Sequence, residues 1–135
     1  MTIELRLDRT AMLAQTVHIR SHELLADISE AEGGGDTGPS PHDLYDAALG
    51  ACKALTVMWY ARKKGIPVED IQTQVEREDA DERKGIYRLT TTLKVHGPLS
   101  DAQLKELEAV ASKCPVHKLM TTVTTEITTR MVRLP

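Results

Sequence analysis

The sequence predicts an α+β fold in the order β-β-β-α-β-β-α-α-β, within a single domain that spans residues 1–135. Two observations predict this class. The strand-like segments form separate groups around one long helical segment, whereas an α/β protein would alternate single strands with helices. The length of 135 residues also suits one domain, and no internal repeat or change of composition marks a boundary.

The N-terminal segments predict an antiparallel meander. In residues 2–9 the side chains of Ile3, Leu5 and Leu7 alternate with charged ones. This period of two is typical of a half-buried strand. Two weaker extended segments follow, near residues 11–19 and 22–29.

A turn-rich loop leads into the long helix. Residues 32–41 contain four glycines and two prolines, which can continue neither regular structure. Ser40 fits the N-cap position, Pro41 the first helical position, and Asp43 completes a pattern that resembles a capping box. We expect a helix over residues 41–64 that ends at Gly65.

This helix is apolar on nearly all sides. Asp46 and Lys53, seven residues apart, share one narrow polar stripe. A helix of this kind must be covered on most sides, and one small sheet covers only one of them. We therefore expect a second copy of the chain to cover another side, and a close helix contact at Gly50.

The second half repeats the pattern of strands followed by helices. Residues 71–78 and 85–96 predict an antiparallel pair around a charged tip. Ser100 and Gln103 form a capping box that starts the next helix, and Cys114–Pro115 opens a short one. Residues 121–134 are rich in β-branched side chains and predict a last strand.

Composition excludes several classes of protein. The chain has 17 Lys and Arg against 20 Asp and Glu, a net charge of −3, which argues against a nucleic-acid binder. No apolar run approaches the roughly 18 residues of a membrane span. No secretory signal is visible at the N-terminus, so we expect the protein in the cytoplasm.

The two cysteines, Cys52 and Cys114, are the main candidates for chemistry. A permanent disulfide is not expected in a reducing cytoplasm. Cys52, midway along the apolar helix, fits a small core residue. Cys114 begins a helical turn before Pro115, where free N–H groups favour a thiolate, so it suits either a capping or a redox role.

Two other interpretations of the cysteines are weaker. Cys52, Cys114, His42 and His117 could supply zinc ligands, although the sequence has no closely spaced cysteine pair. Cys114 and His117 could also serve as nucleophile and base of a hydrolase, but these two residues do not make a triad.

Two motifs identify a family resemblance. Residues 33–69, GGGDTGPSPHDLYDAALGACKALTVMWYARKKGIPVE, resemble the long-helix signature of the OsmC/Ohr proteins. Residues 113–120, KCPVHKLM, resemble the second cysteine motif of that family. The resemblance implies an intertwined homodimer, with two long central helices packed between antiparallel sheets.

The resemblance also implies an activity, thiol-dependent reduction of organic or inorganic hydroperoxides. Cys52 would be the peroxidatic cysteine and Cys114 the resolving one. An external dithiol would reduce their disulfide, with no cofactor, metal, nucleic acid or membrane involved.

The family further uses an acid about ten residues before the first cysteine and an arginine from the N-terminal strands. His42 occupies the acid position, with Asp43 beside it. Arg20 is the candidate arginine, between His18 and His22 on one alternating face of a strand.

The expected contacts with substrate come from three side chains, namely His42, Leu55 and Trp59. Because His42 departs from the acid of the family, the alternative is a non-catalytic protein on the same scaffold. It would sense redox state or bind a small ligand.

Overall fold

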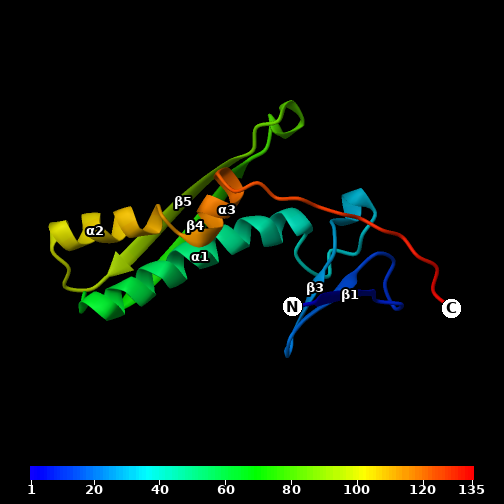
Figure 1. Ribbon diagram of the computed structural model, residues 1–135, viewed down its shortest axis with the longest axis horizontal. Helices are drawn as coiled ribbons and strands as arrows, with labels where there is room; N and C mark the ends of the chain where they lie inside the picture. The colour runs from blue at the N-terminus through cyan, green and yellow to red at the C-terminus, as the bar shows by residue number, and fades with distance from the viewer. The chain divides into compact units, whose positions relative to one another are not determined.

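The computed structural model describes residues 1–135 in the element order β1-β2-β3-α1-β4-β5-α2-α3, with two short 3-10 helices (Figure 1). The chain forms two compact units, residues 1–50 with 74–92 and residues 51–73 with 93–135. No helix is both long enough and apolar enough to span a bilayer.

The predicted N-terminal meander is confirmed. Three antiparallel strands pair in sequence order, namely β1 (Ile3–Leu7), β2 (Gln15–Ile19) and β3 (His22–Ala26). In the register Val17 of β2 lies opposite Leu5 on one side and Leu24 on the other. Val17 is buried, but Leu5 is 54% exposed and its neighbours on β1 are exposed too. One chain therefore leaves the apolar face of β1 uncovered.

A buried carboxylate organises the glycine-rich loop that follows β3 and the 3-10 helix η1 (Glu30–Glu32). Asp27 accepts hydrogen bonds from the Thr37 hydroxyl at 2.7 Å and from the backbone N–H groups of Thr37, Ile28 and Gly35. These bonds, led by that of the Thr37 hydroxyl, lower the pKa of Asp27 to about 2. The loop was predicted, but its anchor was not.

Helix α1 (Pro41–Lys64) begins and ends where its capping residues predict. The Asp43 N–H donates to the Ser40 hydroxyl at 3.1 Å, and the Ser40 N–H donates to the Asp43 carboxylate at 3.0 Å. At the other end Gly65 adopts a left-handed φ of +69°, which suits glycine best.

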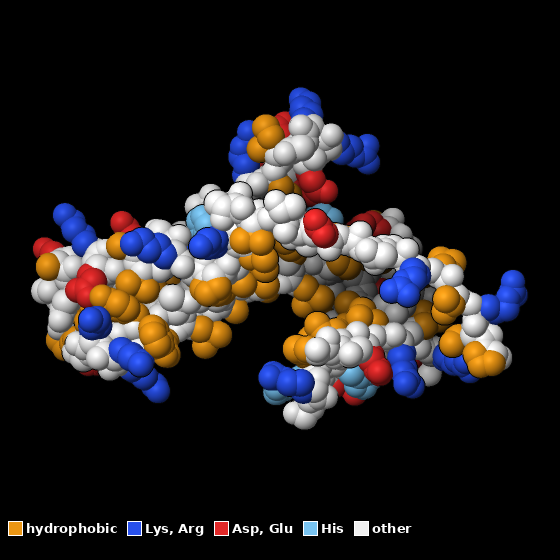
Figure 2. Space-filling model, viewed as in Figure 1, with side chains coloured by type: hydrophobic (Ala, Val, Ile, Leu, Met, Phe, Trp, Pro, Cys, Tyr) orange, Lys and Arg blue, Asp and Glu red, His pale blue; other side chains and the backbone are white.

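The polar stripe of α1 lies on its covered side. Asp46 and Lys53 are only 7% and 4% exposed. The exposed side of the helix is apolar instead, with Leu55 at 70% and Trp59 at 61%. Figure 2 shows uncovered hydrophobic side chains over this helix. As expected, one chain does not cover α1 on all sides, and the side left uncovered is the apolar face that carries Leu55 and Trp59.

The second half of the chain follows the predicted order up to α3. The sheet pairs β4 (Asp70–Glu78) with β5 (Arg88–His96), joined through the 3-10 helix η2 (Glu82–Lys84). Helix α2 (Asp101–Ala111) begins at the predicted Ser100 and Gln103 capping box, and α3 (Pro115–Thr121) follows it. The core between α1 and α2 contains Val57, Ala61, Ile66, Leu107 and Ala111.

The predicted last strand is wrong for this chain. Residues 124–135 have no regular structure, and apolar side chains such as Ile127 (82%) and Leu134 (87%) are exposed. A β-branched sequence fits a pleated surface, but it becomes a strand only where another strand pairs with it. No strand of the chain pairs with this segment.

Candidate functional site

Cys52 lies on the exposed apolar face of α1. The residues of this face follow each other at spacings of three and four, which places them on one side of the helix, and they are Tyr45, Ala48, Cys52, Leu55 and Trp59. Cys52 is partly exposed and is a free thiol. In the single chain Cys52 is therefore not fully buried, because its face of the helix is open, and its interpretation as a small core residue stays a prediction.

Cys114 has the opposite environment. Its side chain is completely buried, and it is the N-cap of α3, immediately before Pro115. Its sulfur accepts a hydrogen bond from the His117 N–H at 3.4 Å. The predicted capping position is confirmed. Cys114 is a free thiol too.

Lys53 connects the elements that carry the two cysteines. It directly follows Cys52, and its Nζ donates to the Ala111 carbonyl oxygen at 2.8 Å. The same Nζ lies 2.9 Å from Nδ1 of His117, three residues after Cys114. The turn of α1 that follows Cys52 is thus bonded to the end of α2 and to α3. The two motifs, whose cysteines are 62 residues apart in sequence, meet in one part of the fold.

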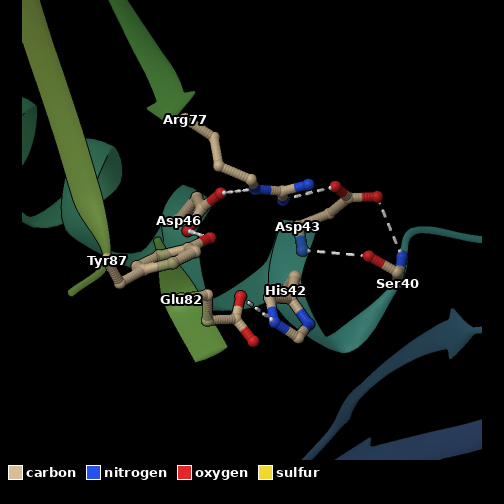
Figure 3. Close-up of polar contacts among 7 residues, drawn as sticks. All are labelled: Ser40, His42, Asp43, Asp46, Arg77, Glu82 and Tyr87. Carbon is tan, nitrogen blue, oxygen red and sulfur yellow. Dashed lines mark hydrogen bonds and ion pairs between the residues drawn. The ribbon is translucent and has the colours of Figure 1, made fainter. Parts of the chain in front are cut away.

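The first turns of α1 hold a separate cluster of charged groups, drawn in Figure 3. Asp46 accepts hydrogen bonds from Nε of Arg77 at 2.6 Å and from the Tyr87 hydroxyl at 2.7 Å. Nη2 of Arg77 donates to Asp43 at 2.8 Å. The guanidinium of Arg77, on β4, therefore bridges two carboxylates that lie three residues apart on α1.

These contacts shift three pKa values. The hydrogen bond to Asp43, followed by that to Asp46, raises the pKa of Arg77. The Ser40 N–H, followed by Arg77, lowers the pKa of Asp43. Burial, followed by the bond to Asp46, raises the pKa of Tyr87 to about 12. At neutral pH Asp43 is thus a carboxylate, Arg77 a guanidinium and Tyr87 a neutral phenol.

His42, which occupies the acid position of the family, pairs with another carboxylate. Its Nε2 lies 3.0 Å from Oε1 of Glu82, and its ring packs edge-on against Tyr87 (Figure 3). These three residues, with Pro41 and Tyr45, line a pocket of about 400 Å³. Its aromatic side chains suit an apolar ligand.

The prediction that Arg20 lies on a strand face beside His18 and His22 is wrong. Because Ile19 pairs with His22, Arg20 and Ser21 form the two-residue turn between β2 and β3. Arg20 is exposed and has a φ of +57°, as such turns require. The alternation of the sequence hid this turn, because neither Arg20 nor Ser21 is a typical turn residue.

The metal and hydrolase interpretations gain no support. No group of three or more His, Cys, Asp or Glu side chains is arranged to hold a metal. His42 pairs with Glu82, and Nδ1 of His117 is bonded to Lys53. The contact between Cys114 and His117 uses the backbone N–H, so the imidazole is not placed as a base for this sulfur.

Arg77, Tyr87 and the bonds of Lys53 were not predicted as parts of a site. The sequence did contain one sign of these contacts, namely the two polar residues Asp46 and Lys53 within an apolar helix. A polar group on a covered face needs a hydrogen-bonding partner, so each of them indicated a partner elsewhere in the chain. Nothing in the alternating strand sequence around Arg77 distinguishes it from a solvated arginine.

A comparison with protein families decides the identity of the fold. The sequence model of the OsmC-like proteins matches residues 33–130, which include both cysteines. The chain belongs to the OsmC-like protein family. No curated protein matched it.

Solved structures agree with this OsmC-like fold. An OsmC-like protein from Mycoplasma pneumoniae has a TM-score of 0.70 and 21% identity over 90% of this chain and 87% of that one. An organic hydroperoxide resistance protein OsmC from Legionella pneumophila has a TM-score of 0.65 and 19% identity over 90% and 88%. The organic hydroperoxide resistance protein OhrB of Bacillus subtilis has a TM-score of 0.59 and 23% identity over 90% of each chain. The α+β fold of the OsmC/Ohr proteins is therefore confirmed.

Proposed function

We propose that this OsmC-like protein is a thiol-dependent peroxidase that reduces hydroperoxides through Cys52 and Cys114. Two of the similar structures are named for organic hydroperoxide resistance, which supports this class of substrate. The observation that carries the proposal is the bond between Lys53 and His117 at 2.9 Å. It joins the helical turn next to the partly exposed thiol to the helix that begins at the buried one.

The reaction has three steps. The Cys52 thiolate attacks the distal oxygen of the hydroperoxide, the O–O bond breaks, and the alkoxide leaves with a proton as an alcohol. Cys52 becomes a sulfenic acid, and Cys114 condenses with it to form a disulfide and water. An external dithiol then reduces the disulfide by exchange. Since this last step needs a reducing compartment, we place the reaction in the cytoplasm.

The other proposed site residues follow from the family and from the open face of α1. Leu55 and Trp59 offer exposed apolar surface to the organic part of a substrate, and His42 contributes from the pocket near the start of the helix. Asp43 takes the role of the family acid, and Arg20 that of the activating arginine. The Arg77 guanidinium is bonded to Asp43 and Asp46 and orients the acid.

We propose a homodimer as the working form. The apolar faces of β1 and α1 are open in one chain, with Leu5 at 54% and Leu55 at 70% exposure. Large open apolar surfaces are rare on monomers, so we expect a second copy of the chain to cover each of these faces. Sedimentation measures the mass directly, and Leu5→Glu on β1, which is not among the proposed substrate contacts, should shift it toward one chain.

The central experiment follows peroxide consumption by the reduced protein. The parent should consume cumene hydroperoxide and form the Cys52–Cys114 disulfide. The variant Cys52→Ser should be inert. The matched Cys114→Ser variant should consume one equivalent and leave a sulfenic acid that dimedone traps. Equal consumption by the parent and by Cys52→Ser would refute the assignment.

A second candidate function is a redox sensor or binder of a small apolar ligand. The pairing of His42 with Glu82 beside the aromatic pocket favours it, because His42 replaces the acid of the family. The same assay separates the two candidates. A peroxidase turns over with an excess of dithiol, whereas a sensor is oxidised once and slowly.

A further inference from the structure

Lys53 is a buried lysine without a carboxylate partner. Its residue is 4% exposed, and none of the ion pairs of the protein, within 4.0 Å, includes it. Burial of an ammonium group costs free energy unless hydrogen bonds compensate for the lost water. The compensating acceptors are the Ala111 carbonyl oxygen at 2.8 Å and Nδ1 of His117 at 2.9 Å.

The ring of His117 is the second polar group that meets the Lys53 side chain, through Nδ1 at 2.9 Å. A lysine ammonium group only donates, so in this contact it needs Nδ1 as an acceptor. The backbone of the same residue donates to the sulfur of Cys114 at 3.4 Å. His117 therefore contacts Lys53 with its ring and Cys114 with its N–H. The chain of contacts runs from the residue after Cys52 to the buried sulfur.

We propose that Lys53 and His117 are positioning residues that hold α3, and with it Cys114, where its sulfur can reach Cys52. This inference rests on the proposed function, in which Cys114 resolves the oxidised Cys52. Cys114 is fully buried. A buried thiol meets its partner only if the surrounding helices present it, and correct presentation raises the rate of an intramolecular reaction strongly.

Lys53 and His117 give up no atoms or electrons in the step that they assist, which is the formation of the disulfide. The Cys114 thiol loses its proton to water, and its thiolate attacks the sulfur of the Cys52 sulfenic acid. The S–S bond forms, the S–O bond breaks, and the leaving hydroxide takes up the proton that the Cys114 thiol released, so that the products are the disulfide and one water. Lys53 and His117 are unchanged at the end of the step.

The test uses a mixed disulfide, so that it does not depend on peroxide chemistry. One equivalent of a thionitrobenzoate disulfide reagent labels the partly exposed Cys52 of the reduced full-length protein, and mass spectrometry verifies the labelled position. Attack by Cys114 then releases thionitrobenzoate, which is followed by its absorbance. The variant Cys114→Ser measures the background release.

Three variants test the positioning residues. Lys53→Met and His117→Leu remove one end of the bond each, and release should slow about tenfold or more, as expected for loss of a hydrogen bond to a charged group. His117→Asn keeps an acceptor near the place of Nδ1 and should retain most of the parent rate. If His117 only stabilised the fold, His117→Asn and His117→Leu would release thionitrobenzoate at the same rate when the two variants are compared at equal folded fraction.

The inference is overturned if Lys53→Met and His117→Leu release thionitrobenzoate as fast as the parent. It is also overturned if the parent releases no faster than Cys114→Ser. If Lys53→Met does not fold, the pair of His117 variants decides. Failure of the parent to consume hydroperoxide, with release intact, refutes the proposed function alone.

Discussion

The substitution Asp46→Asn tests the charged cluster at the start of α1. The asparagine keeps the size of the side chain and can still accept the bond from Tyr87. It loses the negative charge that receives Nε of Arg77 at 2.6 Å. The side chain of Asp46 is 10% exposed, so solvent replaces little of this bond.

The magnitude follows from that burial. A hydrogen bond between charged groups contributes about 1.5–3 kcal/mol, and Arg77 keeps its second partner, Asp43. We therefore expect a loss of about 2 kcal/mol in the free energy of unfolding. For a chain of this length Tm should fall by roughly 6–8 °C.

The matched control is Asp43→Asn, whose side chain is 52% exposed. Exposed ion pairs contribute about 0–1 kcal/mol, so this variant should lose no more than half as much. Both variants are compared by thermal and urea unfolding at one protein concentration, because association shifts Tm. An equal or larger loss in Asp43→Asn would show that burial of the Asp46 pair is not what stabilises the cluster.

The same variant has a spectroscopic readout. Tyr87 has a pKa of about 12, raised first by burial and then by the bond to Asp46. Titration of tyrosinate absorbance should show this pKa falling in Asp46→Asn but staying above its ordinary value of 10.0. Since the folded pKa is the higher one, the stabilisation from Tyr87 is present below pH 10 and is lost as pH rises through about 12.

Two further predictions concern the glycine-rich loop. The pKa of Asp27 is about 2 in the folded chain against an ordinary 3.8, so its stabilisation is present above about pH 4 and is lost as pH falls toward 2. In urea unfolding the stability difference between the parent and Asp27→Asn should shrink over that range; a constant difference would contradict the role of the Thr37 bonds. Gly34→Ala should lower the free energy of unfolding by about 1–3 kcal/mol, because its Cβ would overlap the Ile28 carbonyl oxygen. The control Gly35→Ala meets its nearest neighbour at 3.5 Å and should cost clearly less; the reverse order would refute the steric argument.

Local features of the fold could be predicted because neighbours in sequence create them. The Ser40 and Asp43 cap, the stop at Gly65 and the Ser100 and Gln103 box each depend on groups within a few residues. The alternation of β1 likewise predicts a strand without reference to its partner. The two cysteine motifs resemble those of the family for the same reason, as each is a short continuous segment.

The sequence by itself therefore determined the element types, their order up to α3, the family and the two thiols. Only the tertiary structure decided that Asp46 and Lys53 face inward, since their partners Arg77 and His117 lie 31 and 64 residues away. It also left residues 124–135 without a strand, because pairing needs a second strand in space and not only a suitable composition. Contacts of this kind depend on which distant groups meet, and a one-dimensional pattern of residue types does not contain that information.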